Sequence, residues 1–365
     1  MSLVDWPEAA PPPARPLRRR AAGAGRAVSV ALALVSRLGW LLLVVWAAVS
    51  LTFVLSRVVP ADPARLAAGL QAGPEQVAEV RRALGLDQPV WEQYGRYLSG
   101  IVRLDLGDSV QTRRPVLDDV LRYLPATLEL VITAFVLYAV LGIALGTVWA
   151  MRPRGSASKV IGLTSIAGAA VPVFWIALVL QLIFGYRLGW FPISGTLDYF
   201  AADVPRRTGF TTLDAILAGN GSALADALRH MALPVTALIA SQLAVATRLT
   251  RSSMAAELRR PYVRAARARG ATETRIVLVD ALRNALNPVI TVLGLQFGWL
   301  LGGTILVEVV FSWPGLGLYA FNSFRTFDYN PILALTIITT VTFVIVNELV
   351  GLLYPLLDPR LKEAG

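Results

Sequence analysis

The chain has 365 residues, of which 55% are hydrophobic and only 16% are charged, and its formal net charge is +10. Soluble domains carry about 25% charged and 45–50% apolar residues, so the composition argues against a soluble enzyme, a disordered protein or a disulfide scaffold. The absence of cysteine and the single histidine, His230, exclude disulfides, thiol chemistry, cysteine-ligated metal centres and sites built from several histidines.

Six apolar stretches are long enough to cross a bilayer, whose core of about 30 Å needs about 20 helical residues. None alternates with the period of two that a membrane β-barrel requires. The sequence therefore predicts an all-α, polytopic membrane protein with six transmembrane helices. The expected spans are Leu38–Val59, Thr127–Ala150, Val160–Gly185, Ala232–Leu249, Pro288–Phe311 and Pro331–Tyr354.

Basic residues are distributed unevenly between the two sides of this predicted bundle. If the N-terminus is cytoplasmic, the inner segments hold 20 of the 34 Lys and Arg residues with seven acids, whereas the outer segments hold 14 of each sign. An excess of Lys and Arg marks the cytoplasmic side of a membrane. We therefore expect both termini in the cytoplasm of a bacterial-type cell, with the positive charge facing membrane lipid and not a nucleic acid.

The sequence divides into three parts. Residues 1–36 form a basic tail that we expect to be cytoplasmic and flexible, residues 37–126 hold the first span and an extracellular helical segment, and residues 127–365 form a five-helix core. A cleaved signal peptide is the competing interpretation of the N-terminus. The first apolar run, of about 22 residues, is longer than the apolar region of a signal peptide, which has 7–15 residues.

Two outer segments are longer than a simple turn. Within 60–126, a helical stretch begins after Gly73 and ends at Gly85, and a second stretch covers Trp91–Leu104. We expect two short helices on the outer membrane face, serving either as a packing cap over the bundle or as a surface for a partner. The other long segment, residues 186–231, ends near His230, which is either a structural residue or a ligand.

The cytoplasmic segment 251–287, between spans four and five, carries the clearest local signals. Pro261 suits the first position of a helix, the Ala- and Arg-rich stretch after it favours helix, and Gly270 suits the residue that follows a helix end. Thr272 can cap a second helix, which we expect to end before Pro288. The predicted apolar stripe of that second helix consists of Ile276, Val279, Leu282 and Leu286.

A helix, a glycine corner and a second helix predict a rigid cytoplasmic knob. Such a knob can enter a groove on a partner, with its arginines setting orientation and charge complementarity. The alternative is a basic loop that rests on lipid headgroups. The ordered series of proline, glycine and threonine positions favours the knob.

The stretch Tyr262-Val-Arg-Ala-Ala-Arg-Ala-Arg-Gly270 and the residues after it resemble the EAA loop of permeases from binding-protein-dependent ABC importers. The resemblance is to the dipeptide/oligopeptide and nickel branch, and to the first of its two permease subunits. It runs from about residue 35 to the C-terminus. Further matching stretches are Pro60-Ala-Asp-Pro63, Leu84-Gly-Leu-Asp-Gln-Pro89, Phe311-Ser-Trp-Pro-Gly-Leu-Gly317 and Leu356-Leu-Asp-Pro-Arg360.

Two features depart from the family pattern. Arg264 occupies the position of the first Glu of the EAA motif, and the later Ile-x-Leu-Pro does not recur at its usual spacing. A contact to an ATPase that depends on Glu is therefore not transferred to Arg264. The tail, residues 1–36, lies outside the resemblance.

The resemblance implies an ABC type I importer fold and a defined set of partners. These are a second homologous permease, one or two ABC ATPase subunits, an extracellular substrate-binding lipoprotein and a peptide substrate. The chain has no Gly-x-x-x-x-Gly-Lys-Ser/Thr phosphate loop, so we expect a non-catalytic subunit without cofactor or metal, and ATP with Mg on the partners. The residues expected to couple to the ATPase are Tyr262, Arg264, Ala265, Ala266, Arg267, Gly270, Thr272 and Glu273.

Polar residues within membrane spans are candidates for a translocation path. The expected path residues are Gln181, Gln242, Gln296, Glu308 and Asn347. The residues expected to shape an outer gate are Trp313, Pro314 and Gly315, which start the outer turn after span five. The alternative is that small and polar residues only help the helices to pack.

Several alternatives stay open at the level of sequence. The same assembly could carry nickel, glutathione or a haem-like cargo, since a permease sequence says little about cargo. A proton-driven secondary transporter would use Glu129, Glu308 and Glu348 and would show broken helices around a midplane site. A scaffold or channel subunit would explain the spans but not the ordered motifs.

Overall fold

The computed structural model describes residues 22–58, 63–69, 71–83, 85–198, 204–326 and 328–357. Within these ranges the regular structure is helical, apart from one isolated bridge between Asp108 and Pro115, so the predicted all-α class is confirmed. The chain forms two compact units, residues 1–47 and 48–365, and each is described by itself. The helices of the described part are α1 (Ala22–Val58), α2 (Pro63–Ala68), α3 (Pro74–Ala83), α4 (Val90–Val102), α5 (Val116–Met151), α6 (Ser156–Ala170), α7 (Val173–Leu180), π-helix η1 (Gln181–Arg187), α8 (Thr211–Leu217), α9 (Gly221–Glu257), α10 (Pro261–Ala268), α11 (Glu273–Arg275), π-helix η2 (Ile276–Ala281), α12 (Leu282–Val310), α13 (Leu316–Arg325) and α14 (Tyr329–Leu357).

Five helical runs in the described ranges are long and apolar enough to cross a membrane: α1, α5, α9, the continuous run from α11 to α12, and α14. The third predicted span is not one helix, because α6 ends at Ala170 and α7 begins at Val173. Val171 and Pro172 between them have extended backbones. A proline lacks the helical N–H and disfavours helix at the residue before it. The prediction of a continuous span Val160–Gly185 is therefore wrong, and two shorter helices take its place.

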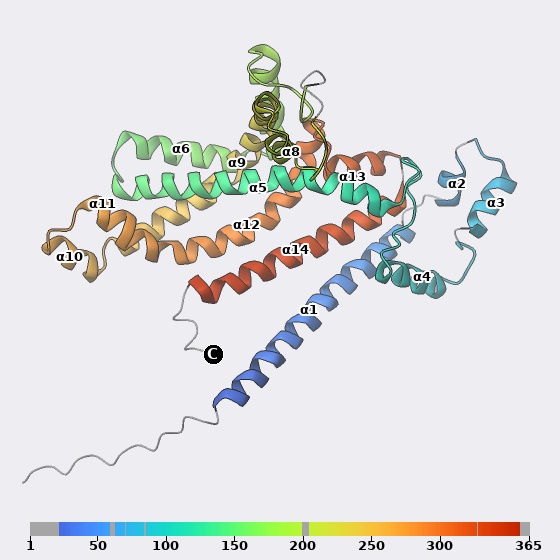
Figure 1. Ribbon diagram of the computed structural model, residues 1–365, viewed down its shortest axis with the longest axis horizontal. Coiled ribbons are helices and arrows are strands. Elements are labelled where there is room, and N and C mark those ends of the chain that lie inside the picture. Colours follow the sequence, from blue (N-terminus) through green and yellow to red (C-terminus); the bar gives the residue numbers. More distant parts are fainter. Residues whose placement is uncertain are drawn as a thin grey trace, which may run out of the picture. The chain divides into compact units, whose positions relative to one another are not determined.

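The core of the second unit forms around α9, which contacts α5, α6, α7, α8 and α12 (Figure 1). Small residues let α5 and α9 approach each other closely. A Cβ added at Gly142 would lie 2.4 Å from the Cβ of Ala246, and one added at Gly146 would lie 2.5 Å from the Cβ of Thr250. Small residues at helix contacts are typical of membrane bundles. Large apolar side chains such as Val140 remain exposed on the outside of the bundle, as a lipid-facing surface requires.

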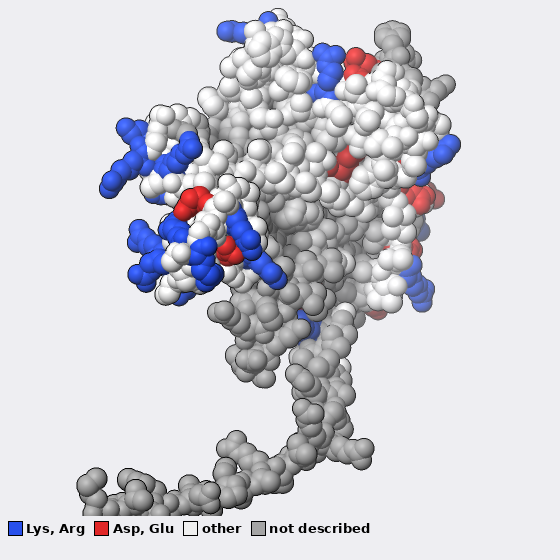
Figure 2. Space-filling view, turned by 60° about the vertical axis from the view of Figure 1, so that its left-hand side comes forward, with Lys and Arg blue, Asp and Glu red and all other residues white. Residues whose placement is uncertain are grey.

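The two ends of the second unit differ in the helices and in the charge that they carry. Figure 1 places α10 and α11 at one end of the bundle and α2, α3 and α4 at the other. Figure 2 brings the α10–α11 end forward and shows Lys and Arg side chains gathered there. This arrangement agrees with the charge distribution in the sequence and puts α10 and α11 on the cytoplasmic side.

The two predicted outer helices are confirmed as α3 and α4. Helix α3 starts at Pro74, and the chain turns at Gly85, whose φ is +61°. Three further short outer helices, α2, α8 and α13, were not predicted. Residues 1–21 of the predicted tail lie outside the described residues, and α1 begins at Ala22.

Candidate functional site

Local signals build the cytoplasmic corner between α10 and α11. Pro261 is the first residue of α10. An N–H at this position has no acceptor within the helix, so proline costs no hydrogen bond there. Gly270 follows the helix end with a φ of +81°, and the N–H of Ala271 donates to the carbonyl of Ala266 at 3.1 Å. These are the features of a Schellman motif. Thr272 then caps the next helix, because its Oγ1 accepts the backbone N–H three residues on at 3.4 Å. The predicted start, stop and cap are confirmed.

A small apolar core fixes α10 against the helix that follows the corner. Val263 and Ile276 are fully buried, and Ala266 is 5% exposed. These three side chains pack together with Leu258, from the end of α9, and Ala271 beside them. Since the core joins residues from both sides of the bend, the corner is one rigid piece.

Tyr262 ties this corner to two of the long helices. Its hydroxyl donates to Oε2 of Glu257 at the end of α9 (2.8 Å) and accepts from Nδ2 of Asn284 in α12 (3.3 Å). Burial, followed by the hydrogen bond to Glu257, raises the pKa of Tyr262 above its ordinary value, so the hydroxyl remains a donor at neutral pH. Tyr262 therefore fastens α10 to both α9 and α12.

The outward face of the corner is basic and carries a bridge across the bend. Arg264, Ala265 and Arg267 are exposed. Arg267 binds Glu273 through two hydrogen bonds, Nε to Oε1 at 2.6 Å and Nη2 to Oε2 at 3.1 Å. This bridge raises the pKa of Arg267 and lowers the pKa of Glu273. Arg264 has no carboxylate partner in the described part of the chain, so its charge is available to a partner.

The apolar stripe expected after the corner is corrected by the structure. Ile276 is buried as predicted, but Val279 is 58% exposed, and Val277 and Ala281 are buried instead. The cause is η2, because a π-helical turn holds an additional residue and shifts the positions that follow by about one place. A stripe predicted with the α-helical period of 3.6 residues therefore assigns Val279 to the buried face, although this π-helical turn places Val277 and Ala281 there.

The expected helix end before Pro288 is also wrong. Helix α12 continues through Pro288 to Val310. Ala285 and Val289, on either side of the proline, are 1% and 0% exposed. Packing of this segment thus overrides the preference of proline for a helix end, and the corner continues into span five without a loop.

Two of the five predicted path residues meet inside the bundle. Nε2 of Gln296 in α12 donates to Oε1 of Gln242 in α9 at 2.8 Å, and both residues are half-buried. Gln181 lies elsewhere, at the start of η1, where Nε2 donates to the carbonyls of Ile193 (2.8 Å) and Val310 (2.9 Å). Asn347 belongs to α14, but its side chain lies outside the described residues.

The fifth predicted path residue, Glu308, meets the predicted gate at the outer end of α12. Its side chain is fully buried, and its carboxylate accepts from Thr127 Oγ1 (2.7 Å), Gly317 N (2.6 Å) and Leu318 N (3.1 Å). A carboxylate at this place stabilises the N-terminus of α13. Trp313 is also fully buried, and its Nε1 donates to a main-chain carbonyl of α5 at 2.9 Å.

Close packing completes this group, which we call the outer cluster: Thr127, Glu308, Trp313, Gly315 and Gly317. A Cβ added at Gly315 would lie 2.6 Å from the Glu308 carboxyl carbon, so this position accepts only glycine without movement. Pro314 lies in the same turn. Sequence reasoning missed Thr127, because its partner lies 181 positions away along the chain.

Comparison with known proteins assigns the family. Residues 142–363 match the family described as "Binding-protein-dependent transport system inner membrane component", and residues 32–131 match its N-terminal family. The chain belongs to this family. The resemblance seen in the sequence is confirmed, and the protein is a multi-pass permease of a binding-protein-dependent ABC transport system in the bacterial inner membrane.

Several relatives align with nearly the whole permease. It is 40% identical over 329 residues to the di/tripeptide transport system permease protein DppB of Pseudomonas aeruginosa, covering 90% of this chain and 97% of the relative. It is 40% identical over 325 residues to the probable D,D-dipeptide transport system permease protein DdpB of Escherichia coli, covering 89% and 96%. It is 36% identical over 312 residues to the glutathione transport system permease protein GsiC of E. coli, covering 86% and 92%.

Glu129, a second buried acid in the permease's long helices, also has structural partners. Glu129 of α5 is 4% exposed and accepts from the N–H groups of Thr211 (2.9 Å) and Thr212 (2.6 Å), at the start of α8. Glu129 and Glu308 therefore both hold the N-termini of outer helices, and neither faces an open path in this conformation. This arrangement argues against a proton-driven transporter that relies on these carboxylates. Glu348 is half-buried in α14.

His230 belongs to a small group on the outer side of α9. The ring is buried, with Nδ1 3.0 Å from the carbonyl of Asp226 and Nε2 3.7 Å from Oδ1 of Asp198. Asp226 also accepts the backbone N–H of Asp198 at 2.7 Å. The group joins the segment before α8 to the first turns of α9, and its three side chains offer ligand atoms that lie within 4.8 Å of one another.

Proposed function

We propose that this permease forms one half of the translocation path for short peptides in an ATP-driven importer. The cargo is inferred from the relatives, since two of those at 40% identity carry names that specify di/tripeptides and D,D-dipeptides. Glutathione, which GsiC is named for, is itself a short peptide. The partners are a second homologous permease, one or two ABC ATPase subunits that hold ATP and Mg, and an outer substrate-binding protein.

The rigid corner from Tyr262 to Glu273 is the observation that carries the coupling mechanism. Its outward face is basic and built on small residues, which permits close approach of a partner groove. Its inward side is anchored to α9 through Glu257 and to α12 through Asn284. A partner ATPase that pulls on the corner therefore moves both helices as a rigid body. Those two helices carry Gln242 and Gln296, which we propose as path residues.

The outer cluster is proposed as the closed outer gate. In this conformation Glu308 and Thr127 hold α13 against the ends of α5 and α12, with Trp313 buried between them. Opening requires these hydrogen bonds to be exchanged for water or for a substrate group. In the closed state Glu308 therefore blocks the path while its carboxylate stays buried.

The test of coupling uses Arg264, because its charge is unpaired within the described chain. We expect Arg264→Glu to reduce peptide uptake by the reconstituted complex about tenfold, since a reversed charge at a complementary interface costs at least about 1.4 kcal/mol. Arg154→Glu, on the exposed turn between α5 and α6, is the matched control. Normal uptake and normal ATPase co-purification with Arg264→Glu would remove the corner from the mechanism.

Arg267 needs a separate test because it is bridged to Glu273. Arg267→Glu breaks that bridge as well as altering the outward face, whereas the exchanged pair Arg267→Glu with Glu273→Arg restores the bridge. Recovery in the exchanged pair would show a structural role for the bridge. Loss in both variants would show that a partner recognises the charge of Arg267 itself.

A panel of dipeptides, tripeptides and glutathione in the same uptake assay identifies the cargo.

A further inference from the structure

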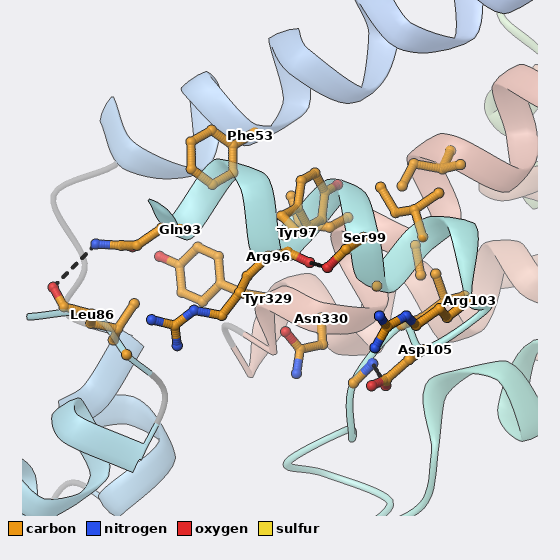
Figure 3. Close-up of a pocket in the computed structure, with 18 of the residues that line it drawn as sticks. Phe53, Leu86, Gln93, Arg96, Tyr97, Ser99, Arg103, Asp105, Tyr329 and Asn330 are labelled. Carbon is orange, nitrogen blue, oxygen red and sulfur yellow. Dashed lines mark hydrogen bonds between the residues drawn. The ribbon is translucent and has the colours of Figure 1, made fainter. Parts of the chain in front are cut away.

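A cavity of about 500 Å³ opens on the outer side of the second unit, away from the corner and from the outer cluster. It lies between α4, the C-terminal end of α1 and the first turns of α14 (Figure 3). This volume falls within the range of about 300–1,000 Å³ that small-molecule sites occupy. The mechanism proposed above does not use any of the residues that line it.

One side of the cavity is positively charged. Arg96 and Arg103 are seven positions apart in and just after α4 and therefore lie on one face of that helix, and both line the cavity. Neither has a carboxylate partner in the described part of the chain. Asp105, beside Arg103 in Figure 3, accepts the backbone N–H of Gly107 at 3.1 Å. The site thus offers two guanidinium groups for an anion and one carboxylate for a hydroxyl or ammonium group.

The opposite side of the cavity is apolar and belongs to the membrane-spanning helices. Phe53 lies near the end of the apolar run Val35–Val54, and Leu333, Ala334 and Ile337 lie in the run Tyr329–Val346. Figure 3 shows Phe53 at one end of the site and Arg103 with Asp105 at the other. The cavity therefore runs from the charged outer surface to the apolar region of the bilayer, which is the polarity of a phospholipid.

Three buried polar atoms between these two sides lack a hydrogen-bond partner in the described structure: Gln93 Oε1, Tyr97 OH and Tyr329 OH. All three side chains line the cavity. Burial, then the neighbouring Tyr94, raises the pKa of Tyr97 to about 12, so its hydroxyl remains a donor. Buried polar groups are nearly always satisfied in folded proteins, and ester and glycerol oxygens or ordered waters would satisfy these.

We propose that this cavity binds one phospholipid of the outer leaflet. Arg103, beside Asp105, holds the phosphodiester, and Arg96, two turns earlier on α4, adds positive charge to the same headgroup region. Asp105 receives the hydroxyl or ammonium group of the headgroup, and the acyl chains enter beside Phe53 and Ile337. A lipid in this place fastens α4 to the outer ends of α1 and α14. The same guanidinium pair could accept a soluble phosphate, and the test below separates the two sources.

The test measures lipid binding directly on the purified, delipidated full chain. Phosphatidylglycerol is titrated into detergent micelles, and native mass spectrometry gives the fraction of chains that carry one lipid. We expect Arg96→Gln with Arg103→Gln to weaken this binding at least tenfold, because the charge-assisted hydrogen bond to Arg103 and the positive charge of Arg96 are both lost. Arg96→Lys with Arg103→Lys, which keeps the charge, should retain part of it. Arg82→Gln on α3, outside the cavity, is the matched control.

Each outcome bears on the proposal. Equal binding by the wild-type chain and the double Gln variant, with an unchanged unfolding temperature, would overturn it. Displacement of the lipid by millimolar inorganic phosphate or glycerol 3-phosphate would assign the site to a soluble anion and would also overturn it. Binding of uncharged diacylglycerol as tight as that of phosphatidylglycerol would contradict the role of the arginines. The measurement requires neither ATP nor peptide, so its result is independent of the proposed transport function.

Discussion

The replacement Gly270→Ala tests how much the corner depends on its bend. Gly270 has a φ of +81°, and no heavy atom lies within 4 Å of the position where a Cβ would be added. The penalty is therefore only that of an L-residue in left-handed backbone, about 1–2 kcal/mol. Alanine also restricts the unfolded chain, which returns about 0.4–1 kcal/mol. The net expectation is about 1 kcal/mol, or roughly fivefold more frequent opening of the corner.

Hydrogen exchange of the Ala271 amide measures this opening, because that N–H is bonded to Ala266 across the bend. We expect it to exchange about fivefold faster in Gly270→Ala, with a smaller change in Gly270→Asn, since asparagine tolerates left-handed backbone. Peptide uptake should fall in the same order. Unchanged exchange in the alanine variant, with α10 still folded, would refute the claim that this bend requires glycine.

Three further changes probe the bundle and its outer side. Gly142→Ala should lower stability by about 1–3 kcal/mol in thermal unfolding, because the new Cβ would lie 2.4 Å from Ala246, and Ala246→Gly in the same chain should restore it. Glu308→Gln should lower stability by about 1–3 kcal/mol, since an NH₂ group replaces one of the two carboxylate oxygens that accept from Thr127 Oγ1, Gly317 N and Leu318 N; an unchanged unfolding temperature would exclude the capping role. Burial acts to raise the pKa of Asp214, but hydrogen bonds from neighbouring groups outweigh it and the pKa is lowered, so the stability it adds is present above its unfolded pKa and disappears as the pH falls through its folded pKa. The protection factors of amides around α8, which are exchange rates corrected for the intrinsic pH dependence, should therefore fall below about pH 4, and Asp214→Asn should abolish that fall.

The features that the sequence predicted well depend on neighbours along the chain. Pro261, Gly270 and Thr272 each determine backbone geometry within a few residues, so the start, bend and cap of the corner follow from residue type. The apolar spans depend on composition, which explains why five long helices agree with prediction. The same reasoning located α3 between Gly73 and Gly85, and the stretch Trp91–Leu104 located α4.

The features that prediction missed depend on contacts between distant segments. The bond from Thr127 to Glu308 joins residues 181 positions apart, and nothing local to either one signals it. Pro288 reads locally as a stop, but burial of the flanking turns keeps α12 continuous. The exposure of Val279 follows from η2, whose wider turn is not visible in a pattern analysed with a single helical period.

The wider turn of η2 lies between the cytoplasmic corner and span five, and it determines how far the corner is rotated about the axis of that span. One residue of an α-helix corresponds to about 100° of rotation, so the additional residue in Ile276–Ala281 sets the direction in which the knob points relative to the helix that carries Gln296. Consequently η2 determines the direction of the knob, whereas the packing of α12 determines the direction of Gln296. A one-residue deletion in this short turn would rotate the knob relative to α12 by about 100°, and it would break the packing of Val277 and Ala281 against Met254 of α9.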